Sequence, residues 1–184
     1  MSYHEAGHAF AYWYIGVDLH SVQVIAQKAI GGRAPLVSKN GTLLTGASGI
    51  CEPRVNLFAA RNFNTENRQA SLKEICCKQI FVSLSGPINT EFDTKLPLAQ
   101  CFASSCSHDA SKIQMCCEIG RITQFHYAKL LARTRRLLDT DHAKSAMKTI
   151  ARRLAANGYL RGHRVATCCD SVFGHRPRPF DFSN

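Results

Sequence analysis

A short run near the start of the chain, MSYHEAGHAFAYWY, restricts the fold more than any other feature of the sequence. His4 and His8 are four positions apart, so on a helix both side chains lie on one face, about 6 Å apart along the axis. The other positions after Glu5 are apolar nearly all round, so we expect this helix to be largely buried. Buried polar groups need partners, and the two histidines and Glu5 therefore predict a bound metal ion.

The pattern H-E-x-x-H on a helix is typical of zinc peptidases. His4 and His8 would each give one ring nitrogen to the metal, at about 2.0–2.1 Å. Glu5 would take a proton from a water whose pKa zinc lowers to about 7. Gly7 disfavours a helix by about 1 kcal/mol relative to Ala, so we expect another segment to pass close to it. The alternative is a surface helix on which these polar residues have no role.

A catalytic zinc ion usually has three protein ligands and one water, so a third ligand must be found. Ala11 and Tyr14 stand where the metzincin pattern has a glycine and a histidine. No acidic residue lies between Asp18 and Glu52, which excludes a glutamate some 20 residues downstream. The third ligand therefore comes from a more distant part of the chain.

The segment YHEAGHA (residues 3–9) is similar to the zinc-helix signature of FtsH-type peptidases, protease domains normally joined to a membrane-anchored AAA ATPase. The resemblance covers about residues 1–169. It implies that His4 and His8 are zinc ligands, that Glu5 is the catalytic base, and that Asp109 is the third ligand. Further segments resemble this family in the same order along the chain, at residues 17–33, 77–91, 101–114 and 146–165.

The same resemblance implies a supporting role for Glu91, which matches the acidic residue after the family's glycine turn. Glu91 would orient the zinc histidines by accepting their hydrogen bonds, and it also competes with Asp109 as the third ligand. Cys106 and His108 flank Asp109 and carry atoms that bind zinc. Position alone explains Asp109 better as an acid in the first turn of a helix than as a zinc ligand.

The chain also departs from this family. It has no G-x-x-x-x-G-K-[ST] loop, so we expect no ATP, and no apolar run is long enough to predict a membrane span. Residues 88–90 (Ile-Asn-Thr) replace the small residues that usually precede the acidic position. Only three residues precede His4, which places this ligand in a first helical turn, where helices fray. That position favours metal binding over full catalytic competence.

Periodicity and breaker residues predict an α+β fold that is mostly α-helical. It would combine a zincin-like active-site helix, a small early β element and a C-terminal helical bundle. These elements would form one domain, residues 1–170, and a mobile polar tail, residues 171–184, would follow it. Pro87 should end or kink the second helix at Gly86, and Ser107 should cap the next helix. The expected helices are 1–15, 69–84, one from about 108, 121–138, 141–156 and 162–169, with a strand at 20–27, a strand or two and a long loop within 28–68, and a loop at 93–107.

Charge and cysteine content restrict the compartment and the partners. The net charge is +10, and residues 112–184 contribute 14 Lys or Arg against 5 Asp or Glu. Nine cysteines, six of them in adjacent pairs and none in a C-x-x-C motif, favour reduced thiols in the cytoplasm. The alternative, a secreted disulfide scaffold, would need a leader that the sequence does not show.

The preferred function is an ATP-independent zinc endopeptidase that cleaves unfolded or flexible polypeptides. The second candidate is a catalytically weak or inactive zinc-binding regulatory module of the same fold. The third is a basic helical nucleic-acid-binding domain, which rests on charge alone. No recognition motif accompanies that charge, so we do not expect nucleic acid as a partner. Assembly as a homo-oligomer stays open.

Overall fold

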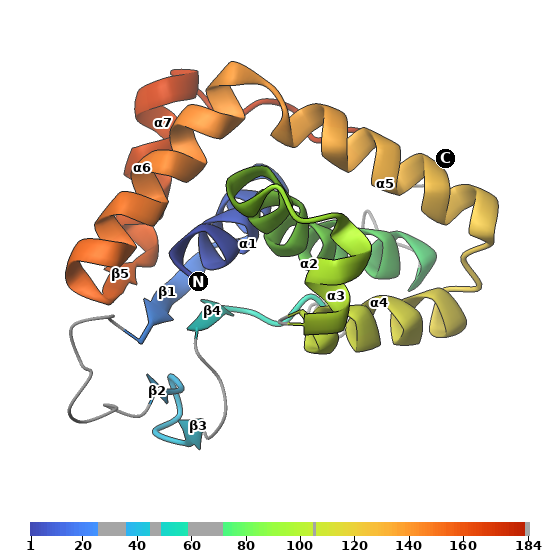
Figure 1. The fold of residues 1–184 in the computed structure, drawn as a ribbon, viewed down its shortest axis with the longest axis horizontal. Coiled ribbons are helices and arrows are strands. Elements are labelled where there is room, and N and C mark those ends of the chain that lie inside the picture. Colours follow the sequence, from blue (N-terminus) through green and yellow to red (C-terminus); the bar gives the residue numbers. More distant parts are fainter. Residues whose placement is uncertain (26–35, 45–48, 59–71, 105, 183–184) are drawn as a thin grey trace, which may run out of the picture.

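The computed structural model describes residues 1–25, 36–44, 49–58, 72–104 and 106–182. Helices dominate, and a small antiparallel sheet combines early strands with one late strand, so the expected α+β, mostly α-helical class is confirmed (Figure 1). In chain order the elements are α1 (Ser2–Tyr14), β1 (Leu19–Val24), β2 (Leu36–Val37), β3 (Leu43–Leu44), β4 (Gly49–Pro53), α2 (Leu72–Thr94), α3 (Leu98–Ser104), α4 (Ser107–Ile119), α5 (Gln124–Leu138), α6 (Asp141–Asn157), β5 (Tyr159–Arg161) and α7 (Gly162–Phe173).

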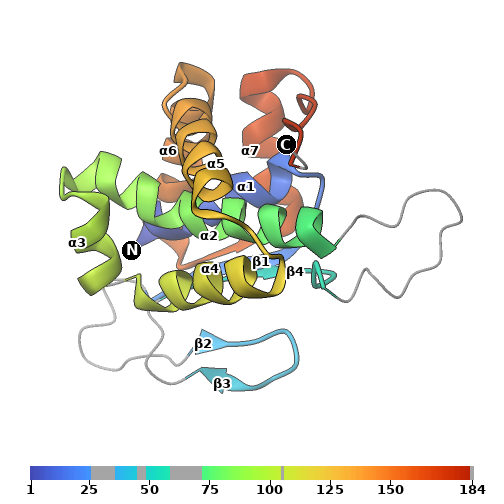
Figure 2. The same cartoon turned by 90° about the vertical axis from the view of Figure 1, so that its right-hand side faces the viewer.

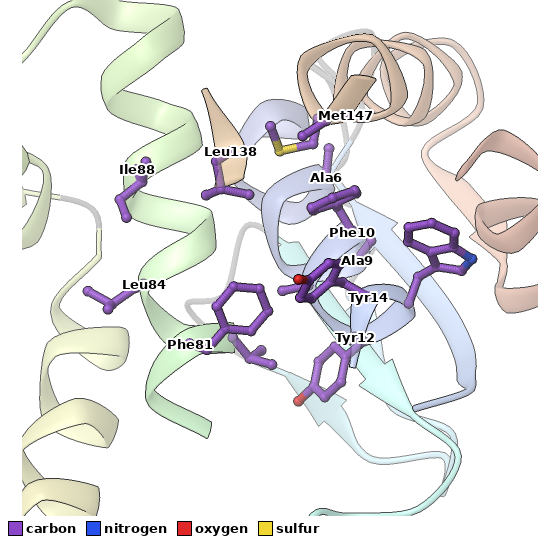
Figure 3. Packing of buried hydrophobic residues seen from close by; sticks show 14 of the residues in the cluster. Ala6, Ala9, Phe10, Tyr12, Tyr14, Phe81, Leu84, Ile88, Leu138 and Met147 are labelled. Carbon is purple, nitrogen blue, oxygen red and sulfur yellow. The ribbon is translucent and has the colours of Figure 1, made fainter. Parts of the chain in front are cut away.

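Helix α1 is the centre of the fold, in contact with α2, α6, α7 and the sheet. Every residue from Glu5 to Tyr14 is buried, as its apolar composition predicts. Its aromatic side chains meet those of α2, where Tyr14 lies against Phe81 (Figure 3). The expectation of a buried helix is therefore confirmed, and the polar residues of α1 are held inside the protein.

The contact between α1 and α2 depends on Gly7. A Cβ atom at this position would overlap the backbone carbonyl of Ser85 and lie 3.0 Å from Cα of Gly86. Atoms do not approach that closely without a shift in the backbone, so any larger residue would push the two helices apart. The predicted close approach of another segment to Gly7 is confirmed.

Pro87 does not end α2, which was one of the two outcomes we expected, and the helix continues to Thr94. Pro87 has no N–H to donate to the carbonyl four residues earlier, but residues beyond it are held by α1. The side-chain amide of Asn89 donates to the carbonyl of Tyr3 at 2.6 Å, and Ile88 is fully buried. Tertiary contacts thus offset the local preference that the sequence alone predicts.

The expected loop at 93–107 was also wrong, because α3 lies within it. Its start is stabilised from a distance, since Oε1 of Glu91 accepts from the backbone N–H of Leu98 at 3.1 Å. Helix α4 begins at Ser107 itself, with Cys106 at the N-cap and no side-chain cap bond. The expected Ser107 cap is therefore wrong by one residue.

The three-stranded sheet has the order β4-β1-β5, with both pairings antiparallel. Strand β1 corresponds to the strand expected at residues 20–27, of which residues 26 and 27 lie outside the described residues. Within the segment expected to hold a strand or two and a long loop, β2 and β3 form a separate hairpin and β4 pairs with β1 (Figure 2). Parts of the expected loop, and the start of the helix expected from residue 69, lie outside the described part of the chain, at residues 28–35, 45–48 and 59–71.

The C-terminal helices match the predicted bundle, and part of the expected tail packs on the core. Helix α7 extends to Phe173, beyond the expected domain boundary at residue 170. Phe182 is buried, and Phe180 stacks against it and against the ring of Tyr14. Aromatic side chains therefore tie the expected polar tail to the core. Among the described residues, none of the helices combines the length and apolar character that crossing a membrane requires.

Gly7→Ala should lower the free energy of unfolding by about 1–3 kcal/mol, the usual effect of overpacking. In an open helix the same change would raise stability by about 1 kcal/mol, so the sign of the effect reports the contact. Urea denaturation measures it. Ser145→Ala on the exposed face of α6 is the control, with an expected change within about 0.5 kcal/mol. A Gly7→Ala protein as stable as the parent would contradict the described α1–α2 contact.

Phe182→Ala should lower the free energy of unfolding by about 3–5 kcal/mol, because the ring is only 6% exposed and packs on Phe81 and Phe180. Phe125→Ala is the matched control, since Phe125 is 67% exposed. Thermal and urea unfolding of the two variants separate the alternatives. A mobile tail would make the two substitutions equally harmless.

Candidate metal centre

Three side chains from two distant segments converge beside the first turns of α1. Nε2 of His4 lies 3.0 Å from Nε2 of His8, and Oδ2 of Asp109 lies 3.1 Å and 3.4 Å from these two nitrogens. His4 and His8 share one face of α1, and Asp109 comes from the first turn of α4. The structure therefore brings together the three residues that the sequence predicts as metal ligands.

Hydrogen bonds on the outer nitrogens fix which ring atoms carry protons. Nδ1 of His8 lies 2.8 Å from the carbonyl of Val82, which can only accept, so this nitrogen is the donor. Nδ1 of His4 lies 3.2 Å from Oγ1 of Thr90, whose own proton goes to the carbonyl of Gly86. In the neutral rings, both Nε2 lone pairs therefore face the centre, which is the state that binds a metal.

Gly86 on α2 makes room for the two imidazoles. A Cβ atom there would lie 2.5 Å from Nε2 of His8 and 2.9 Å from Cε1 of His4. Any side chain at this position would displace the rings. Gly86 lies next to the proline that we expected to end or kink the helix, so sequence reasoning explained it as part of a helix end and missed its role at the site.

The electrostatics of the cluster favour a positive charge at its centre. Burial has the largest single effect and would lower the pKa of His8, but the Asp109 carboxylate, the charge of Glu5 and the carbonyl of Val82 together raise that pKa to about 9. Burial would raise the pKa of Asp109, but the two imidazoles hold it well below its usual range. The pKa of His4 is also raised, since hydrogen bonds to Asp109 and Cys106 oppose the effect of burial.

Glu5 is buried next to the cluster, with 5% of its surface exposed. Burial raises the pKa of its carboxyl group, and the charges of His8 and His4 oppose this effect. The residue is confined by β4, because a Cβ atom on Gly49 would lie 2.5 Å from Oε1 of Glu5. A desolvated carboxylate with a raised pKa is well suited to accept a proton.

Glu91 is not placed where we predicted. Oε1 of Glu91 accepts from Leu98 N–H at 3.1 Å and from the Arg135 guanidinium at 3.0 Å. Oε2, which is buried, lies 2.8 Å from the same guanidinium. Glu91 therefore holds α3 and α5 rather than the histidines. The predicted orienting role is filled by the carbonyl of Val82 and the hydroxyl of Thr90, which sequence reasoning did not single out for it.

The two residues that flank Asp109 do not join the centre. Sγ of Cys106 lies 3.5 Å from Nδ1 of His4, which is the outer nitrogen. His108 is exposed. Among the described residues, the convergent set of potential metal-binding side chains is His4, His8 and Asp109.

The donor set fits a zinc ion. Ligands at about 2.0–2.1 Å in tetrahedral geometry lie about 3.3 Å from one another. The separations of 3.0, 3.1 and 3.4 Å between the three atoms are close to this value. Two imidazoles and one carboxylate also leave the fourth position of a tetrahedron to a non-protein ligand, the arrangement of catalytic rather than structural zinc sites.

A scan against family models and a search of curated proteins both found no match to this chain.

Asp109→Asn should weaken zinc binding strongly, because it replaces the only charged ligand in a set with two neutral imidazoles. Thr90→Val should weaken it about 10–100-fold through the loss of the partner of His4. Glu91→Gln should change it little, since Glu91 contacts α3 and α5. Competition with a graded chelator measures all three affinities. The described centre would be contradicted if the Glu91→Gln protein lost its zinc and the Asp109→Asn protein kept it.

Proposed function

We propose that this chain is a zinc-dependent endopeptidase. The observation that carries the proposal is the convergence of two imidazole lone pairs and a buried carboxylate within 3.0–3.4 Å, with Glu5 next to the first histidine on the same helix. Three electron-pair donors in one place can hold a metal ion. The resemblance of residues 3–9 and 101–114 to FtsH-type peptidases supports zinc and hydrolysis of peptide bonds.

His4, His8 and Asp109 would hold the ion, which supplies Lewis-acid polarisation of water and of the substrate carbonyl. Glu5 accepts the proton of the attacking water and passes it to the amine that leaves. Burial of Glu5 favours this proton transfer, because it raises the pKa of the carboxyl group. Val82 and Thr90 keep the imidazoles in the tautomer that ligation needs.

The proposed substrate is an unfolded or flexible polypeptide. The sequence has no phosphate-binding loop of the G-x-x-x-x-G-K-[ST] type, so the proposed activity needs no ATP. Without an ATP-driven unfolding step, only chains that are already extended can enter the site. All nine cysteines are free thiols, which supports a reducing compartment such as the cytoplasm.

A zinc-binding module without turnover is the second candidate, and the enclosure of the site favours it. Glu5 is 5% exposed, and the side chains of His4 and His8 are 12% and 10% exposed. A substrate carbonyl must reach this centre for the enzyme to work. Metal binding without cleavage of unfolded polypeptides would identify the module.

Glu5→Gln should keep zinc and lose at least about a hundredfold of the cleavage rate. The amide has nearly the shape of the carboxylate but cannot accept the proton. Cleavage of unfolded casein and zinc content are measured on the same preparation. Unchanged cleavage would exclude Glu5 as the base, and cleavage that persists in both Glu5→Gln and His8→Ala would identify a contaminating protease.

A further inference from the structure

The elements α6, β5 and α7 carry a long run of charge of one sign. Residues 144–169 include six Lys or Arg and no Asp or Glu. The first, Lys144, is paired with Asp139 at 2.6 Å. The other five are all exposed, and we name them the basic face: Lys148, Arg152, Arg153, Arg161 and Arg164.

The basic face is not an ordinary solvated helix surface. Lys144, Lys148 and Arg152 follow one another at intervals of four on α6, a spacing at which like charges repel and destabilise the helix. Solvated faces usually alternate the sign of charge. Within the described part of the chain, no carboxylate forms an ion pair with a basic-face residue. The surface therefore keeps a positive potential that only an external anion can neutralise.

These residues come from neighbouring elements and form one surface. Helix α7 packs on α6, and β5 joins the two (Figure 1). Arg153 on α6 and Arg164 on α7 both act on the thiol of Cys168, where their charges oppose the burial that raises its pKa. Arg153 and Arg164 therefore both lie near Cys168, and the helices that carry them pack on each other.

The sheet connects the basic face with the metal centre. Arg161 on β5 pairs with Ser21 on β1, and β1 pairs in turn with β4, whose Gly49 touches Glu5. Neighbouring strands lie about 4.8 Å apart, and Gly49 pairs with Val24, three residues along β1 from Ser21, so the backbones of Arg161 and Gly49 are separated by about 14 Å. A chain bound at the basic face needs to extend only a few residues to reach the metal centre.

We propose that the basic face docks acidic, extended segments of polypeptide and holds them beside the metal centre. The docking role rests on the proposed peptidase function. Unfolded segments are often highly charged and poor in apolar residues, so a positive surface selects those whose charge is acidic. Docking would raise the local concentration of the attached chain at the site.

Two other anionic partners fit this surface less well. Between residues 141 and 173 the exposed large aromatic residue is Tyr159, so the row of stacking rings that single-stranded nucleic acids use is missing there. The apolar face of α6 is buried in the core and cannot insert into a lipid surface. A flexible acidic peptide needs neither stacking rings nor insertion.

The test compares two unfolded peptides of about 20 residues, one ending in a run of Glu and one with Gln at the same positions. Fluorescence anisotropy with the Glu5→Gln protein measures binding without cleavage. We expect the Glu peptide to bind at least about tenfold more tightly in about 0.05 M salt, with an advantage that shrinks in about 0.2 M salt. Equal binding of the two peptides would overturn the docking proposal.

Lys148→Glu in the same background is the decisive variant. It places a carboxylate four residues from both Lys144 and Arg152, which should stabilise α6, yet it should weaken Glu-peptide binding about fivefold. Lys129→Glu makes the same charge change on the distant start of α5 (Figure 1) and should have less than about a twofold effect. Equal effects of the two variants would show that the peptide responds to the net charge of the protein and not to the basic face, and would overturn the proposal.

Two further outcomes are decisive. A single-stranded oligonucleotide of equal charge that binds at least about tenfold more tightly than the Glu peptide in about 0.15 M salt would assign the face to nucleic acid and overturn the polypeptide assignment. Because binding is measured without turnover, it is independent of the peptidase test. A parent protein that binds the Glu peptide but cleaves nothing keeps the docking surface and contradicts only the proposed enzyme.

Discussion

The close crossing of α1 and α2 is the contact on which the candidate centre depends. It is possible only because Gly7 faces Ser85 and Gly86 faces the two histidine rings. At this separation Nδ1 of His8 reaches the carbonyl of Val82, and that bond turns Nε2 toward the centre. The packing of two helices therefore sets the tautomer and direction of a candidate ligand atom, and two residues without a side chain, Gly7 and Gly86, make this packing possible.

The cluster also sets an electrostatic requirement for the fold. Asp109 is buried, and a buried carboxylate is stable only next to positive charge. The two imidazoles supply that charge by binding protons, or they give their lone pairs to a metal ion that supplies it instead. In both states α4 is drawn toward α1, so the ligand set also contributes to holding the fold together.

Sequence reasoning succeeded where local spacing determines the geometry and failed where tertiary contacts decide. The spacing of His4 and His8 predicts one face of a helix, and the resemblance added Asp109, which the spacing alone could not assign. Pro87 misled the prediction, because packing beyond it outweighs one lost hydrogen bond. Glu91 misled it as well, since nothing local indicates that Arg135, 44 residues away in the chain, binds its carboxylate. The short helix α3 was missed for the same reason, because its start is stabilised by the bond from Leu98 N–H to Glu91.

The first turn of α1 shows how distant residues determine the order of a ligand. His4 lies in a turn without a side-chain cap at its N-terminus, where a free helix would fray. Here α2 supplies the missing constraints, because Asn89 binds the carbonyl of Tyr3 and Thr90 binds the ring of His4. Both residues lie in the segment that differs from the family it resembles, at positions that are usually small. The larger side chains of Asn89 and Thr90 hold the first turn of α1 and the ring of His4, so this departure from the pattern is compatible with the candidate centre.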